Sequence, residues 1–146
     1  MKAYRAFLSV CILVLVCTGC QSARQDQPTD TPATTPTAPA FLRVRPGMMG
    51  PYPAALGSGV LVVRDRCIRL VMPRDPQGYA VIWNEQMSFD GTTITDSETH
   101  MQTQIGAVVT LGGGMGGEYY LDYLDNPADN PCSPPYWLAG HISWYR

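Results

Sequence analysis

The sequence is poor in charge and almost devoid of lysine. Charged residues make up 15% of its 146 positions, against roughly 25% in an average soluble domain. Lys2 is the only lysine, and the stretch from Asp75 to Tyr145 has nine acidic residues but neither lysine nor arginine. From Cys20 onward, eight arginines and twelve acidic residues leave a formal side-chain charge of −4. A chain with this balance is not expected to bind nucleic acid.

Amphipathic helices and catalytic motifs are also missing. Histidine occurs only as His100 and His141, and neither stands with a nucleophile or further ligands in the context that a catalytic triad or a zinc site requires. Ser58 lies in LGSGV, which lacks the first glycine of G-x-S-x-G. We therefore expect no enzymatic activity, no cofactor and no metal site.

The N-terminus has the three parts of an export signal. Lys2 and Arg5 supply positive charge, and an apolar segment of eleven residues follows from Ala6 to Val16. A small Thr-Gly pair then precedes Cys20. A membrane-spanning helix needs about 20 residues, so the short apolar segment predicts export rather than a transmembrane span.

The same segment resembles the lipobox of bacterial lipoproteins, in which signal peptidase II cuts before a cysteine that carries a diacylglyceryl group. Gly19 fits the position before the cut, while Cys17 stands where leucine is usual. The resemblance implies that residues 1–19 are a signal peptide and that a lipid on Cys20 anchors the protein to a membrane of the cell envelope. No aspartate follows the cysteine, which implies the outer membrane in a bacterium that has one. Ordinary cleavage to a soluble secreted protein and an uncleaved anchor remain the alternatives.

Residues 20–40 are predicted to be the lipidated cysteine and a disordered spacer. The spacer has no aliphatic side chain larger than alanine, so it cannot bury enough apolar surface to offset the entropy of ordering. Its evenly spaced prolines favour an extended chain, which at about 3.1 Å per residue reaches roughly 60 Å. We expect the spacer to hold one small β domain, residues 41–146, away from the membrane.

The segment 41–146 contains short β-branched and aromatic runs separated by turn residues. Two of them, 58–64 and 67–72, are separated by two residues and predict a tight hairpin. A turn cluster is expected at 73–78, further strands at 79–83, 86–89, 92–95, 104–111 and 136–145, and either one helical turn or another strand at 118–124. Short strands at this spacing predict an all-β fold, a small barrel or OB-like barrel of five to six strands.

The cysteines predict one disulfide in this domain. Cys11 and Cys17 leave with the signal peptide and Cys20 takes the lipid, so Cys67 and Cys132 remain as a pair. An even pair in an exported domain favours a disulfide over half a metal site. Closing so long a loop stabilises the fold by about 4 kcal/mol in the chain-entropy model.

Three stretches of the domain together resemble a small β domain of uncharacterised bacterial lipoproteins: SGVLVVRDRCIRLVMP…YAVIW, GAVVTLGGG and NPCSPPYWLAGHI. The resemblance covers roughly residues 57–143 and carries information on the fold but none on function. In that group the turn before the first cysteine is often Asp-Gly, whereas here it is Asp65-Arg66. This departure puts a two-residue type I′ turn in question at that place.

Two further stretches are candidate ligand sites. GGGMGG, residues 112–117, contains GxGxxG, but no long helix follows, so a flexible loop or bulge between strands is expected instead of a nucleotide site. LDYLDNPADN, residues 121–130, offers acidic and amide oxygens of the kind that bind Ca²⁺, yet the spacing is not that of a calcium loop. We interpret it as a solvated loop, because Asx and Pro residues are common in turns.

Aromatic residues crowd the second half of the chain and are the best functional hint. They pack either in the core or on an exposed platform for a glycan or peptide, and consecutive pairs cannot both face inward on a regular strand. The platform hypothesis names Tyr79, Trp83, Tyr120, Tyr136, Trp137 and Trp144. We therefore predict a non-catalytic binding or interaction module on the cell envelope, whose partner is a glycan, a peptide or an envelope protein. The alternative is a structural or accessory lipoprotein that supports a larger envelope assembly, with an enzyme a distant third.

Overall fold

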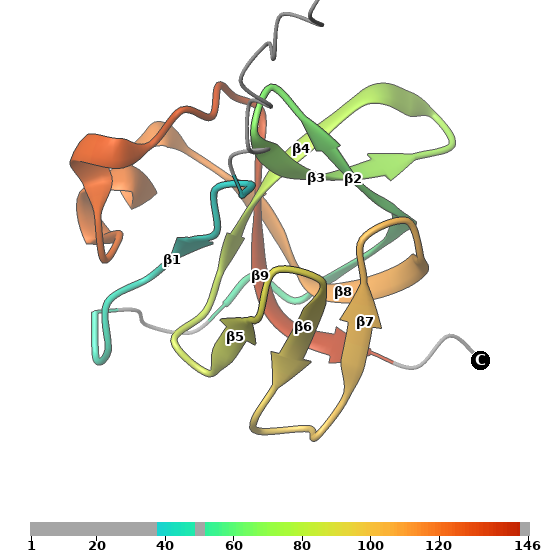
Figure 1. Cartoon of the computed structure of the whole chain (residues 1–146), viewed down its shortest axis with the longest axis horizontal. Helices are drawn as coiled ribbons and strands as arrows, with labels where there is room; N and C mark the ends of the chain where they lie inside the picture. Colours follow the sequence, from blue (N-terminus) through green and yellow to red (C-terminus); the bar gives the residue numbers. More distant parts are fainter. Residues whose placement is uncertain (1–37, 49–51, 144–146) are drawn as a thin grey trace, which may run out of the picture. The chain divides into compact units, whose positions relative to one another are not determined.

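The computed structural model describes residues 38–48 and 52–143. Five of its strands close a barrel (Figure 1): β2 (Ala55–Arg64), β3 (Cys67–Met72), β4 (Asp75–Trp83), β8 (Val108–Gly116) and β9 (Tyr136–Ser143). Around the barrel the order is β2, β3, β4, β9, β8 and back to β2, and only β4 and β9 pair in parallel. The run β8, β2, β3, β4 is a Greek key, which β9 closes. The predicted small, OB-like barrel is thereby confirmed.

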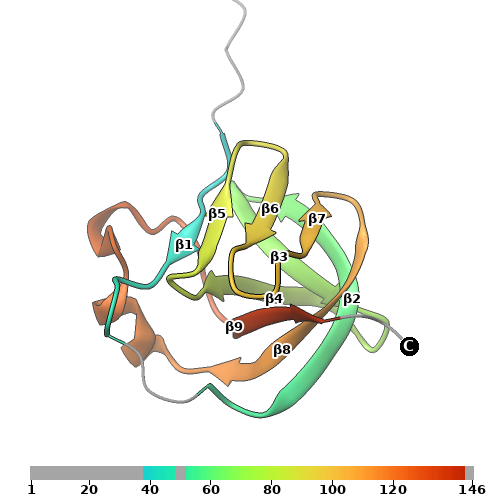
Figure 2. The same ribbon diagram turned by 90° about the horizontal axis from the view of Figure 1, so that it is seen from below.

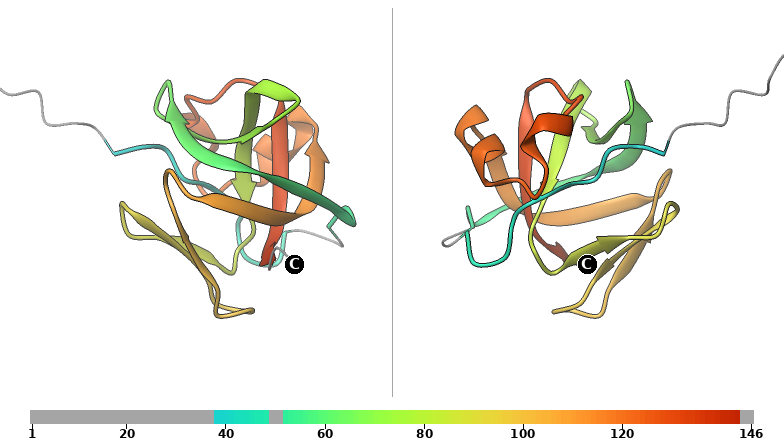
Figure 3. Two further views of the ribbon diagram at one scale, coloured as in Figure 1. Left: turned by 90° about the vertical axis from the view of Figure 1, so that its right-hand side faces the viewer. Right: turned by 60° about the vertical axis from the view of Figure 1, so that its left-hand side comes forward.

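The remaining elements extend or cover the barrel. The short strand β1 (Leu42–Arg43) runs parallel to the end of β4. Strands β5 (Met87–Phe89), β6 (Thr93–Asp96) and β7 (Gln102–Gln104) form a meander that links β4 to β8 and lies at one end of the barrel (Figure 2). The connection from β8 to β9 carries the 3-10 helices η1 (Glu118–Tyr123) and η2 (Pro127–Asp129) and lies on a different side from the meander (Figure 3).

The glycine-rich stretch, for which a flexible loop or a bulge was expected, is a strand that contains a bulge. Strand β8 continues to Gly116 and pairs with β9, with a bulge between Gly112 and Gly113. A Cβ at Gly113 would lie 1.9 Å from the carbonyl oxygen of Leu138, and the residue has a φ of +151°. The glycines therefore allow two strands to approach closely, and they do not form a phosphate-binding loop.

Two other expectations about the strand ends change, and one open alternative is decided. Strand β4 begins at Asp75, so the expected turn cluster shrinks to the residues between Met72 and Asp75. The expected strand 104–111 is divided by a turn, because β7 ends at Gln104 and β8 begins at Val108. At 118–124, where one helical turn or another strand was expected, residues 118–123 form the 3-10 helix η1.

The first hairpin closes through a two-residue turn without glycine. Arg64 pairs with Cys67, and the two central residues, Asp65 and Arg66, have φ values of +50° and +64°. Positive φ at both central positions is the signature of a type I′ turn. The turn therefore forms with a residue pair that places two L side chains in left-handed backbone.

Two buried clusters lie on opposite sides of the barrel wall. The inner core fills the barrel and includes Leu61, Leu70, Trp83, Leu111 and Trp137, all at most 5% exposed. The outer core lies under β1 and the β8–β9 connection and includes Leu42, Val44, Leu124, Tyr136 and Leu138. Strands β4 and β9 are therefore buried on both faces, as strands in parallel pairs often are.

A buried carboxylate ties the meander to the barrel. Asp96, the last residue of β6, is fully buried and accepts the backbone N–H of Ile142 in β9 at 3.0 Å. Its other oxygen accepts the N–H groups of Glu98 and Thr99 at 2.9 and 3.2 Å in an Asx turn. One side chain thus shapes a turn and fixes the meander against the last strand.

Candidate functional site

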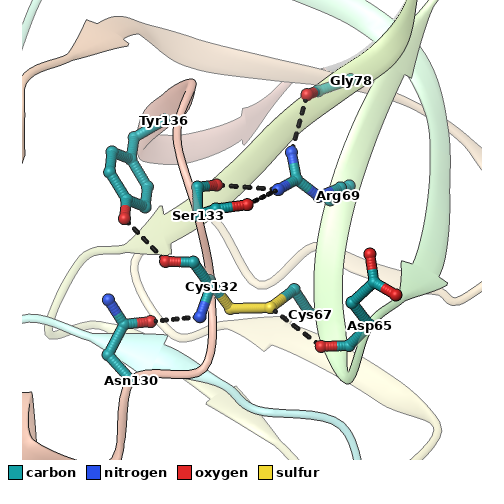
Figure 4. The surroundings of a disulfide bond; sticks show 8 residues. All are labelled: Asp65, Cys67, Arg69, Gly78, Asn130, Cys132, Ser133 and Tyr136. Carbon is teal, nitrogen blue, oxygen red and sulfur yellow. Dashed lines mark hydrogen bonds between the residues drawn. A yellow bond between two sulfur atoms is a disulfide. The ribbon is translucent and has the colours of Figure 1, made fainter.

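The long β8–β9 connection is fixed to the first hairpin by a disulfide (Figure 4). Cys132 in the connection bonds to Cys67, the first residue of β3, with the Cα atoms 5.6 Å apart and a sequence separation of 65. The Cys132 backbone is held on both sides, because its N–H donates to Asn130 Oδ1 at 2.8 Å and its carbonyl accepts the Tyr136 hydroxyl at 2.7 Å. The predicted disulfide is confirmed, and it makes the connection part of the rigid barrel wall.

The same connection covers the outer face of β3 and β4. Arg69 in β3 is only 5% exposed and donates to the carbonyl of Gly78 at 2.9 Å and to the carbonyl and hydroxyl of Ser133 at 2.7 and 3.2 Å (Figure 4). In OB-fold proteins, the face of the second and third strands is a main ligand-binding surface. Strands β3 and β4 hold those places here, so the chain's own connection occupies that surface.

A cleft of about 220 Å³ lies where the connection, the β2–β3 turn and the start of β1 meet. Its apolar lining comes from Ala40, Phe41, Leu42 and Leu124, and its polar lining comes from Arg43, Arg66, Asp125, Asn126 and Asp129. Three of these five polar residues, Asp125, Asn126 and Asp129, belong to the acidic stretch 121–130 that the sequence marks as a candidate ligand site, whereas Arg66 lies in the first hairpin turn and Arg43 in β1. The signal that unites them is spatial, because they come from three separate segments.

Backbone hydrogen bonds hold the three segments in place. The N–H of Ala40 donates to the carbonyl of Arg66 at 2.6 Å, which joins the chain entering the barrel to the β2–β3 turn. The N–H of Asp125 donates to the carbonyl of Arg43 at 2.8 Å, and the two side chains form an ion pair at 2.8 Å. Both side chains are partly exposed, so this pair orients the wall more than it stabilises the fold.

Most of the predicted aromatic platform is buried. Trp83, Tyr136 and Trp137 are 0%, 2% and 5% exposed, and Tyr79 packs edge-on against Trp137 with the ring centres 6.0 Å apart. The premise that neighbours in a strand point to opposite faces holds, since Trp137 fills the barrel while Tyr136 points outward. The outward face is covered by the connection, however, so these side chains pack the two cores and do not present a platform.

Of the other two platform residues, Tyr120 and Trp144, only Tyr120 lies within the described part of the chain. Tyr120 is partly exposed in η1 and lies against Tyr119, which is 60% exposed, with ring centres 4.0 Å apart. A hydrogen bond with Tyr119, together with burial, raises the pKa of Tyr120 to about 12. Trp144 lies outside the described residues, as do Cys20 and the predicted signal peptide.

The candidate calcium loop uses its side chains within the fold. Asp125 pairs with Arg43, and the Asn126 amide donates to the carboxylate of Asp129. Across residues 38–48 and 52–143, no three histidine, cysteine or acidic side chains gather in a way that would hold a metal ion. Within the same ranges, no helix has both the length and the apolar character needed to cross a membrane.

A second surface of note is the outer face of β2 and β8. Two apolar side chains on this face are largely exposed to solvent, Leu56 at 68% and Val108 at 75%. Val108 also lines a shallow groove of about 450 Å³ that contains no charged residue. The groove is lined by Ser58, Gly59, Val60, Val71, Met72, Pro73 and Val108. Exposed apolar surface of this kind is typical of contacts with other macromolecules.

No protein-family model matches the chain, and no significantly similar protein was found among curated sequences or solved structures.

Proposed function

We propose that the protein is a non-catalytic binding module, held at the cell envelope by a lipid on Cys20, which takes its ligand in the cleft between the β2–β3 turn and the β8–β9 connection. The observation that carries the proposal is the position of this cleft. In OB-fold proteins the loops after the first and the fourth barrel strands take part in ligand binding. In this barrel the same two loops line the cleft, and the Cys67–Cys132 disulfide joins them.

The construction of the cleft supports binding rather than a packing role. A wall held by a disulfide and by backbone hydrogen bonds is ordered before the ligand arrives, so binding does not cost the entropy of ordering a loop. The usual alternative, the outer face of β3 and β4, is filled by Arg69 and Ser133. The loop end is therefore the place where a ligand has access.

The cleft also lies where the chain enters the barrel, since Ala40 is part of its lining. A spacer that reaches roughly 60 Å would let this end of the domain search the space above an anchoring membrane. We therefore expect a ligand that belongs to the envelope itself, such as a glycan or a peptide.

Two measurements test the proposal. The intact mass of protein extracted from native membranes should begin at Cys20 and include acyl chains, and a mass without lipid would refute the anchor. NMR titration of the protein with envelope glycans and peptides should shift resonances of cleft residues. Hydrolysis of any of these compounds, or shifts confined to other surfaces, would refute the binding role.

The uncharged groove beside β2 and β8 favours a second function, that of an accessory lipoprotein docked in a larger envelope assembly. A photo-crosslinker placed at Val108 would capture a partner protein in cells under this alternative. A crosslinker at Met115, which is 71% exposed but lies outside the groove, is the matched control. Capture from position 108 alone would favour the accessory role over ligand binding in the cleft.

A further inference from the structure

Arg66 occupies a backbone position that suits glycine. It is the second central residue of the β2–β3 turn and has a φ of +64°. Left-handed backbone is unfavourable for a residue with a Cβ, and glycine is the preferred choice at this place in a type I′ turn. Strain of this kind is retained where the side chain has a task, and the Arg66 side chain lines the cleft.

The guanidinium of Arg66 is free to bind a ligand. It is exposed, and within the described ranges it has no hydrogen-bond or ion-pair partner. The arginines of the flanking strands differ, because Arg64 donates to the carbonyl of Pro76 at 2.6 Å and Arg69 to that of Gly78. Arg66 therefore stands at a strained backbone position, and it is the one arginine of this hairpin whose side chain does not help to hold the hairpin together.

The carboxylates of the cleft come from a different segment. Asp125 is neutralised by Arg43, whereas Asp129 accepts a hydrogen bond only from the neutral Asn126 amide among the residues that the structure describes. The cleft thus offers one unpaired cation, from the β2–β3 turn, and one unpaired anion, from the β8–β9 connection. Apolar residues, Phe41 and Leu124 among them, complete the lining between the two segments.

We propose that this cleft binds a small zwitterion, such as a dipeptide with both ends free, with its carboxylate on Arg66 and its ammonium group on Asp129. This inference rests on the proposed function, which makes the cleft the binding site. Opposite charges on two segments disfavour a ligand of a single sign, since one of the two walls would repel it. A volume of about 220 Å³ suits a ligand the size of a small dipeptide better than an extended polymer.

The test uses the full-length protein and four forms of one dipeptide. Alanyl-alanine carries both charges, N-acetyl-alanyl-alanine only the carboxylate, alanyl-alanine amide only the ammonium group, and the doubly capped form neither. We expect binding of the first, measured by NMR shifts of cleft residues, and affinities at least about tenfold weaker for each capped form, because each loses a charge-assisted hydrogen bond.

Two substitutions in the same turn separate a ligand contact from a structural role. Arg66→Gly relieves left-handed backbone and should raise the Tm by several degrees, whereas Asp65→Gly should change the Tm less, because aspartate is one of the residues that adopt this backbone at the first central position of a type I′ turn. Only Arg66→Gly should weaken dipeptide binding, by at least about tenfold, because Asp65 is not part of the cleft lining. Asp129→Asn should remove the preference for a free ammonium group and leave the preference for a free carboxylate.

Equal binding by all four dipeptides, or unchanged binding by Arg66→Gly, would overturn the inference. Cleft shifts with a disaccharide of N-acetylglucosamine but with no dipeptide would also overturn it, while the proposed binding function would stand. The absence of cleft shifts with every envelope glycan and peptide would refute the proposed function itself.

Discussion

Replacing Asp96 with alanine is the sharpest test of how the meander is attached to the barrel. The carboxylate is fully buried and accepts three backbone N–H groups, two in its own turn and one from Ile142 in β9. In Asp96→Ala the turn N–H groups can be reached by water, since Glu98 and Thr99 are exposed. The N–H of Ile142 is at a buried residue and is left without an acceptor.

The expected loss follows from these contacts. An orphaned buried N–H costs about 1–3 kcal/mol, and each hydrogen bond to a charged group contributes about 1.5–3 kcal/mol. Relief from burying a carboxylate offsets part of this sum, so we expect Asp96→Ala to lose about 3 kcal/mol of unfolding free energy. At roughly 4–8 °C per kcal/mol, the Tm should fall by about 12–24 °C.

Asp90 provides the matched control. It forms the same kind of turn, accepting the N–H groups of Thr92 and Thr93 at 2.9 and 2.7 Å, but it is exposed and reaches no other element. Urea and thermal unfolding, followed by the fluorescence of the buried tryptophans, should show a clearly smaller loss for Asp90→Ala than for Asp96→Ala. Equal losses in the two variants would refute the reasoning, because the link to Ile142 would then contribute nothing.

Three further predictions concern the connection, the glycine strand and acid stability. Cys67→Ala/Cys132→Ala should lose up to about 4 kcal/mol in urea unfolding, from the loop closure that the bond provides, and a loss below about 1 kcal/mol would contradict a stabilising role. Gly113→Ala should prevent cooperative unfolding or lower the Tm severely, because its Cβ would meet the backbone oxygen of Leu138; a near-native Tm would mean that β8 and β9 are not so closely paired. Hydrogen bonds from turn N–H groups lower the pKa of Asp90 below its ordinary 3.8, so its contribution is present above pH 3.8 and is lost as the pH falls through the lowered pKa. Asp90→Asn should therefore lose less stability than the wild type between about pH 4 and 2, and parallel acid profiles would count against this role.

Much of the barrel could be predicted from local patterns. The runs at 58–64 and 67–72 are rich in β-branched residues, which favour strands. Strand propensity therefore predicts the first hairpin correctly. The disulfide followed from counting, because only Cys67 and Cys132 were left for the folded domain. The strand through Gly112 and Gly113 could not be predicted in this way, since glycine removes the side-chain pattern by which strands are identified.

The candidate site was beyond local patterns for a different reason. Arg66, Arg43 and Asp129 are brought together by the closure of the barrel and by a disulfide between distant positions, and no window of sequence contains them. The buried aromatic residues of the predicted platform illustrate the same point. Alternation along β9 correctly placed Trp137 and Tyr136 on opposite faces, but only the three-dimensional path of the β8–β9 connection determines that the outward face is covered.

That covered face has a consequence for how a barrel of this kind acquires a ligand. When a connection lies across β3 and β4 and a disulfide fixes it there, the broad strand surface that suits extended polymers is lost. What remains at the loop end is a small cleft whose walls are held by a disulfide and by backbone hydrogen bonds. In such a cleft, complementary placement of charges contributes to the choice of ligand. The strained Arg66 fits this logic, because relieving the strain with glycine would improve the turn and remove the cation. A gain in stability coupled to a loss of binding in Arg66→Gly is therefore the outcome that the proposed binding site predicts.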